Sequence, residues 1–170
     1  AVQRGRNPWS PYEFAVGIAN DLGITVEICA PGAAMLDGGR ASFDPDLRLI
    51  VHEINGTPFV QAFLVAHEVG HAELGDGEEE AEPAVHVDPA RTSEAAPVGM
   101  DRVVDYSRRQ RREVQMDLFA RELLLPRPVA VDLHVAQGQT CSDIAARLGA
   151  PFEVIAQQML DALLLPAVPV

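Results

Sequence analysis

Two histidines and a glutamate that stand close together in the sequence could hold and use a metal ion. They belong to the stretch His67-Glu68-Val69-Gly70-His71, which has the pattern H-E-x-x-H. On an α-helix, residues four apart point the same way, so His67 and His71 can offer ring nitrogens to one metal ion. Glu68 then lies beside them and can take a proton from an attacking water. The spacing therefore predicts a hydrolytic metal centre on a helix.

The flanking residues predict the helix that must carry this pattern. Thr57 is a capping residue and Pro58 follows it at the first helical position, while Gly75 comes directly after Leu74. We therefore expect a helix from about Pro58 to Leu74. The apolar residues that share a stripe with both histidines at helical spacing are Val60, Phe63 and Leu64. The alternative, two core histidines bonded to backbone carbonyls, is disfavoured by the glutamate between them.

A second predicted helix, over about residues 101–125, carries a pair of carboxylates on an apolar side. Glu113 and Asp117 are four residues apart, and the apolar residues on their side are Met116, Ala120 and Leu124. Carboxylates seldom face a core without a cation to neutralise them. We therefore predict Glu113 as the third metal ligand and Asp117 as the acceptor that holds the N–H of a ligating histidine. A solvated pair on the helix surface is the alternative.

The N-terminal part of the chain predicts one helix and a small sheet. Residues 10–22 have helical spacing, residues 24–28 alternate as a strand does, and residues 41–43 and 47–53 read as an antiparallel hairpin. The hairpin turn is expected at residues 44–46. We expect His52, on its second strand, to be a surface or cross-strand residue and not a ligand. These elements indicate an α+β fold.

Residues 75–100 form an acidic stretch with prolines and no apolar periodicity. This composition predicts a mobile, solvated loop, in which His86 is simply hydrated. A lid over the metal centre or a regulatory segment is the functional alternative.

The last part of the chain predicts a helical subdomain. Residues 141–148 and 151–160 resemble a helix-turn-helix pair, but residues 140–170 contain a single basic residue, Arg147. A recognition helix needs donors for phosphates and bases. We therefore expect a structural or protein-docking element and no direct nucleic-acid binding. The predicted organisation is a core over residues 1–128, with the acidic loop, and a helical subdomain over residues 129–170 packed on it.

Charge and cysteine content exclude several classes of protein. The formal net charge is −12 at pH 7 and the sequence pI is near 4.7, whereas binding to nucleic acid or to a membrane surface needs a basic footprint. No stretch has the roughly 18 continuous apolar residues of a membrane span. Cys29 and Cys141 follow no disulfide or metal spacing. We therefore expect a reducing, cytoplasmic compartment.

Two motifs together resemble the ImmA/IrrE family of metallopeptidases. One is H-E-x-x-H, and the other runs from Glu113 to Pro126 as E-V-Q-M-D-L-F-A-R-E-L-L-L-P, close to the family phrase E-x-x-A-N-x-F-A-x-x-L-L-M-P. Here Asp117 replaces the commoner Asn, which preserves an acceptor, and Met116 replaces a small residue, which crowds the helix packing. The link between the motifs is also longer and more acidic than expected, which bears on substrate access.

The resemblance implies a fold, a reaction and a partner. The fold is α+β, a minimal thermolysin-like zincin core with a small antiparallel sheet and helix-turn-helix-like helices at the C-terminus. The activity is a metal-dependent endopeptidase of gluzincin type, with one zinc ion, or manganese as the alternative. Its substrate is a helix-turn-helix transcriptional repressor in a stress response or in mobile-element transfer. The alternative is a non-catalytic, metal-containing regulator or a toxin–antitoxin-type binding protein. An oxyanion or substrate contact is expected from Tyr106, His134 or Arg121.

Overall fold

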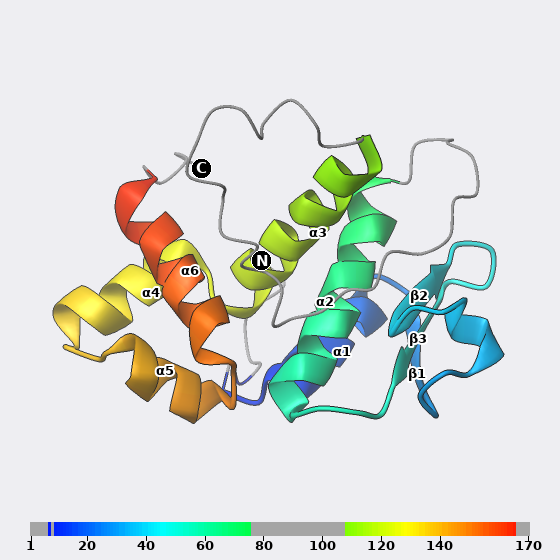
Figure 1. Cartoon of the computed structure of the whole chain (residues 1–170), viewed down its shortest axis with the longest axis horizontal. Coiled ribbons are helices and arrows are strands. Elements are labelled where there is room, and N and C mark those ends of the chain that lie inside the picture. Colours follow the sequence, from blue (N-terminus) through cyan, green and yellow to red (C-terminus); the bar gives the residue numbers. More distant parts are fainter. Residues whose placement is uncertain (1–6, 8, 76–107, 166–170) are drawn as a thin grey trace.

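The computed structural model describes residues 7, 9–75 and 108–165, which form a mostly helical fold with one three-stranded sheet (Figure 1). The predicted α+β class is therefore confirmed. The elements in chain order are α1 (Pro11–Asp21), β1 (Thr25–Cys29), the short 3₁₀ helix η1 (Ala34–Leu36), β2 (Ala41–Asp44), β3 (Leu49–Glu53), α2 (Pro58–Leu74), α3 (Arg108–Leu124), α4 (Arg127–Val131), the π-helical stretch η4 (Asp132–Ala136), α5 (Cys141–Leu148) and α6 (Phe152–Leu164). The predicted acidic loop with His86, and residues 101–107 of the predicted second helix, lie outside the described residues.

The sheet has the strand order β1-β3-β2 and is mixed. The predicted hairpin is present, since β2 and β3 pair antiparallel, and β1 adds to the other side of β3 in parallel. β3 begins at Leu49 and not at the expected residue 47. The reason is local: the Asp44 carboxylate accepts the backbone N–H groups of Asp46 and Leu47, each at 2.9 Å, which keeps both residues in the turn.

Of the two positions expected for His52, the structure has the cross-strand one: the residue pairs with Ala41 of β2 and is fully buried. Its Nδ1 lies 2.9 Å from the carbonyl oxygen of Glu53, which can only accept, so Nδ1 carries the proton. Its Nε2 therefore accepts from the Tyr12 hydroxyl at 2.9 Å. The pKa of His52 is lowered by burial, an effect that the Glu53 carbonyl and carboxylate only partly offset. A neutral His52 thus joins α1 to β3.

This buried pair predicts a loss of stability in acid. A folded-state pKa below the unfolded value near 6.5 means that the unfolded chain binds more protons as the pH falls below that value. The contribution of His52 is therefore complete above about pH 6.5 and declines below it. We expect urea unfolding to show a larger loss of stability between pH 7.5 and pH 5.5 in the wild type than in His52→Gln. Equal losses in the two proteins would contradict a neutral, buried His52.

α2 is the central helix of the described fold, and it packs against α1, α3, β2 and β3. Its bounds are those predicted, and the Thr57 hydroxyl accepts the N–H of Val60 as the helix cap. Residues 62–70 are all buried, so this helix is covered on every side over that span and not along one stripe. Side chains on this part of α2 are therefore held by packing from several elements.

The C-terminal helices pack onto this core: α6 contacts α3, and α4 and α5 contact α6 (Figure 1). α5 has the predicted bounds and begins with a capping box between Thr140 and Asp143. α6 extends four residues beyond the expected end at Leu160, because no residue that breaks a helix occurs before Pro166. A single hydrophobic cluster includes residues of α1 and α2 as well as of α5 and α6. The two predicted units therefore share a core.

Candidate metal centre

Two imidazole rings project from the same side of α2. His67 and His71 are one helical turn apart, and both lie toward the C-terminal end of the helix. Only 1% of His67 is exposed, and His71 is half-buried. The first ring is therefore fixed by its surroundings, while the second reaches toward the surface.

α3 brings two carboxylates to the same place. Met116, Ala120 and Leu124 are buried and form the contact side of this helix, as its spacing predicted. Glu113 and Asp117 lie next to that side and are partly exposed. The packing of α3 against α2 thus carries both carboxylates to the histidines of α2.

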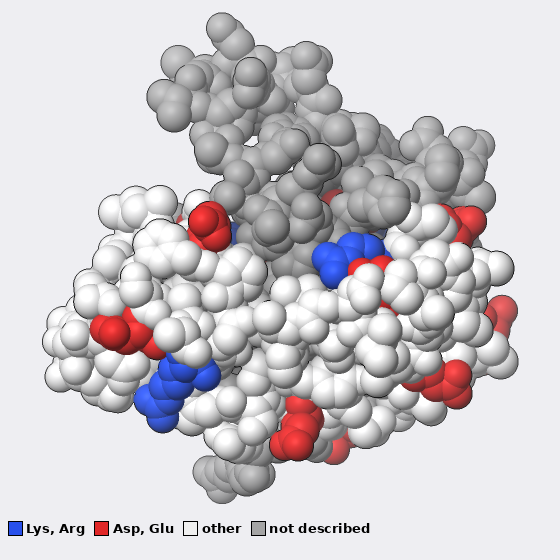
Figure 2. Space-filling model, turned by 60° about the horizontal axis from the view of Figure 1, so that its bottom comes forward, with Lys and Arg blue, Asp and Glu red and all other residues white. Residues whose placement is uncertain are grey.

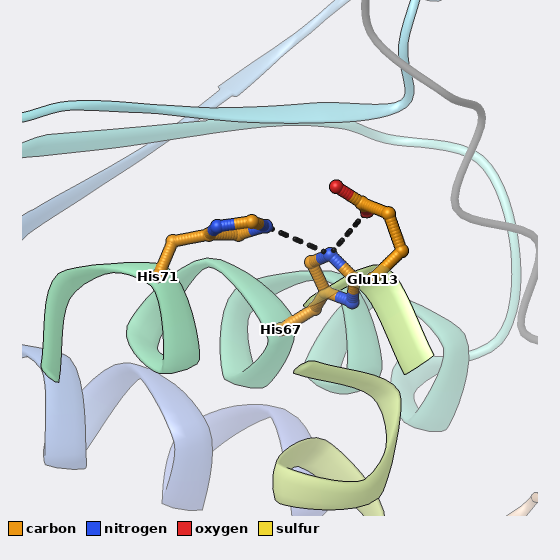
Figure 3. Close-up of side chains that lie close together, drawn as sticks. All are labelled: His67, His71 and Glu113. Atoms are coloured by element: carbon orange, nitrogen blue, oxygen red, sulfur yellow. Dashed lines mark hydrogen bonds and ion pairs between the residues drawn. The ribbon is translucent and has the colours of Figure 1, made fainter. Parts of the chain in front are cut away.

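Figure 3 shows the side chains of His67, His71 and Glu113 pointing toward one another from α2 and α3. His67 Nε2 lies 3.1 Å from His71 Nε2 and 3.3 Å from Glu113 Oε2. One ligand atom from each residue can be chosen so that all three lie within 4.8 Å of one another. Ligands at about 2.1 Å from a tetrahedral zinc ion are separated by roughly 3.4 Å. The spacing therefore fits three ligands of one small metal ion.

Asp117 orients the ring of His67. Its Oδ1 lies 2.9 Å from His67 Nδ1. A carboxylate can only accept, so His67 donates Nδ1–H to Asp117. In the neutral ring the lone pair is therefore on Nε2, the nitrogen that lies nearest to His71 and Glu113. A ligating histidine in a protein commonly has such a partner, which fixes its tautomer and makes it a better ligand.

The charges around His67 favour a cation at this place. Burial is the largest effect on the pKa of His67 and lowers it, but hydrogen bonds with Asp117 and Glu113 and the negative charge of Glu68 outweigh burial and raise the pKa to about 9. The surroundings therefore stabilise positive charge despite little contact with water. Two imidazoles and a carboxylate are also a donor set of hydrolytic zinc sites. By spacing, charge and chemistry, the three residues fit a divalent metal ion.

Glu68 is buried beside this group, with 6% of its surface exposed. It follows His67 directly on α2, and its charge contributes to the raised pKa of that histidine. Its carboxylate is therefore close enough to His67 to act on the charge of that ring.

Of the three predicted oxyanion or substrate contacts, the two that the structure describes, Arg121 and His134, bond to partners outside this group. Arg121 is buried and its Nη2 pairs with Asp161 of α6 at 2.9 Å. His134 lies in η4, where its Nδ1 donates to the carbonyl oxygen of Gln139 at 2.8 Å. Tyr106 is outside the described residues. The oxyanion role of each residue stays a prediction.

Sequence reasoning missed contacts that join distant elements around the centre. The Gly70 backbone lies against Met116 and Phe119 of α3. Thr57, besides capping α2, donates its hydroxyl to the carbonyl oxygen of Gly149 at the end of α5 at 2.9 Å. The glycine in the interior of α2 was the signal that could have pointed to a close helix contact.

The chain belongs to a family of metallopeptidase type. This is the Peptidase_M78 family, described as the IrrE N-terminal-like domain, whose match covers residues 19–160. The resemblance to ImmA/IrrE metallopeptidases is thereby confirmed. Comparison with curated proteins gave no significant match, and comparison with solved structures gave none either. Within the described residues, none of the helices has the length and apolar character needed to cross a membrane.

Proposed function

We propose that this protein is a zinc-type endopeptidase that cleaves one specific partner protein. The observation that carries the proposal is the convergence of His67, His71 and Glu113 next to a buried Glu68, in a chain of a metallopeptidase family. His67, His71 and Glu113 would hold the ion, with zinc expected first and manganese as the alternative. A bound ion supplies Lewis-acid chemistry, since it polarises a carbonyl group and makes water more acidic.

The protein's own groups have separate tasks in this proposal. Asp117 keeps the proton of His67 on Nδ1 and so keeps Nε2 free to ligate. Glu68 accepts the proton of the attacking water and then returns it to the leaving amine. Burial of His67 and Glu68 excludes bulk water from this side of the centre and strengthens these interactions.

The proposed substrate is a helix-turn-helix transcriptional repressor. Membership in a peptidase family supports a protein substrate, and the resemblance to ImmA/IrrE proteins supports a repressor in particular. Direct binding to DNA is disfavoured by the surface: on the face in Figure 2, acidic side chains are scattered and the basic ones form no continuous patch. The guanidinium of Arg147, the lone basic group of residues 140–170, stacks on Trp9 with its carbon 3.3 Å from the ring centre.

The setting of the reaction follows from the same proposal. A repressor substrate places the enzyme in the cytoplasm, and both cysteines are free in the structure, as a reducing compartment requires. The second candidate is a regulator that keeps the metal centre but acts by binding its partner, as in toxin–antitoxin pairs. Buried Glu68 favours catalysis, because a purely structural metal site needs no carboxylate beside its ligands.

A time course with a co-encoded repressor tests the proposal. Purified wild type and Glu68→Gln are each incubated with the repressor at equal metal loading, and the products are separated on a gel. We expect cleavage by the wild type alone, because the amide cannot accept a proton. Binding without cleavage by either protein would support the regulator instead. Cleavage by both would show that Glu68 is not the proton acceptor or that another protease is present, which mass spectrometry of the products separates.

A further inference from the structure

The two halves of the metal centre lie on different helices, so their separation depends on how closely α2 and α3 pack. His67 and His71 belong to α2, whereas Glu113 and Asp117 belong to α3. Metal ligation tolerates errors of only about 0.2 Å in ligand distance. A residue that sets the distance between the helices would therefore act on the centre without touching the ion.

Gly70, which directly precedes His71, faces Met116 and Phe119 of α3. A Cβ atom placed on Gly70 would lie 2.9 Å from Met116 Sδ and 3.1 Å from Phe119 Cδ1. The first distance is shorter than real Cβ atoms show, and the second is tight. Met116 has 1% of its surface exposed, so its thioether has little room to turn away. A methyl group at position 70 would thus push α3 outward or displace both side chains.

The backbone at Gly70 does not itself require glycine. This residue lies in the interior of α2, and it is not among the glycines with positive φ. Glycine inside a helix is less favourable than alanine, because it loses more backbone freedom on folding. The local conformation therefore favours alanine, and the contact with Met116 and Phe119 favours glycine. The absent side chain is explained by the neighbouring helix.

Met116 connects this contact to the carboxylates. It directly precedes Asp117 and lies one helical turn after Glu113, so a shift of α3 at Met116 moves both groups relative to His67. Because Gly70 has no side chain, it leaves the space that the Met116 thioether occupies.

We propose that Gly70 is a positioning residue, and that its missing side chain lets Met116 pack so that Glu113 and Asp117 reach His67. The inference rests on the proposed metal centre. It makes a prediction opposite in sign to helix propensity: Gly70→Ala should weaken metal binding, although alanine favours the helix. It also predicts a compensating substitution: shortening the side chain of Met116 should make room for the methyl group added at position 70.

The test compares zinc affinity, measured by competition with a chelator, in four variants with intact far-UV circular dichroism. Gly70→Ala should bind zinc at least about tenfold more weakly than the wild type, as when an orienting group around a metal is lost. Gly70→Ala combined with Met116→Ala should bind zinc more tightly than Gly70→Ala alone. Met116→Ala is the reference for this double variant. Ile144→Val, a buried change in α5, should lower the urea midpoint of unfolding without weakening zinc binding.

A second measurement keeps this inference separate from the proposed function. In the metal-free protein, the proton on His67 Nδ1 should give a low-field NMR signal that is identified by its loss in His67→Gln. Gly70→Ala should shift or broaden this signal, and the double variant should restore it. If the wild type bound no metal, the proposed function would be wrong. The NMR signal of His67 would still show whether Gly70 sets the packing of α3 against α2. Unchanged zinc affinity and an unchanged signal in Gly70→Ala, or no recovery in the double variant, would overturn the inference.

Discussion

Glu68→Gln is expected to keep its metal and its fold while losing at least about a hundredfold in peptidase activity, the usual contribution of a general base. The substitution keeps the size of a side chain that is 94% buried, and it leaves His67, His71 and Glu113 in place. Glu113→Ala removes one of three proposed ligands, so it should lose metal affinity as well as activity. The two variants therefore separate the proton acceptor from the ligand.

Metal content after dialysis against a chelator, measured together with activity, checks this division. Glu73→Gln is the matched control, since it makes the same chemical change at an exposed position of the same helix. It should resemble the wild type in both measurements. Equal metal loss in Glu68→Gln and Glu113→Ala would show that Glu68 is a ligand. Metal retention in Glu113→Ala would instead remove Glu113 from the proposed set.

Asp161→Ala is expected to lower the free energy of unfolding by about 3 kcal/mol, because it leaves a buried cation without its partner. Arg121 is 5% exposed, and within the described structure its Nε and Nη1 have no hydrogen-bond partner. Its Nη2 depends on Asp161 of α6. Removing that carboxylate therefore exposes the full cost of burying the guanidinium.

Changing both partners should recover much of this loss. Arg121→Met combined with Asp161→Ala removes the charge with its partner, so urea unfolding should show it to be more stable than Asp161→Ala alone. Glu153→Ala, at an exposed carboxylate of α6, is the control and should cost less than about 1 kcal/mol. Simple additivity in the double variant would argue against the pair. A loss of kcat in Arg121→Met at unchanged stability would support the predicted oxyanion role.

Features coded by neighbouring residues were predictable from the sequence. The bounds of α2 followed from Thr57, Pro58 and Gly75, and α5 has the bounds that were expected, Cys141–Leu148. The grouping of His67, His71 and Glu113 also agrees with the structure, because helical spacing limits where side chains can point. Their roles as ligands stay a prediction, as do the roles of Glu68 and Asp117.

Features that depend on contacts between distant residues were not predictable. The buried His52 bonds to the hydroxyl of Tyr12, 40 residues earlier in the chain. The residue pattern of a strand does not indicate such a distant partner. β1 pairs in parallel with β3, and the alternation of apolar and polar residues in β1 does not indicate which strand it will pair with. Arg121 gave no sequence signal of its pair with Asp161, since helical residues of either charge are usually solvated.

The hydrogen bond between His67 and Asp117 joins residues 50 positions apart, which has a consequence for the order of folding. Closing a flexible loop of that length costs roughly 3–4 kcal/mol of chain entropy before any contact between its ends forms. The hairpin of β2 and β3 and the pair of α5 and α6 close much shorter loops. We expect these local units to form before the docking of α3 onto α2. The histidines of α2 and the carboxylates of α3 would then come together late in folding, after these local units have formed.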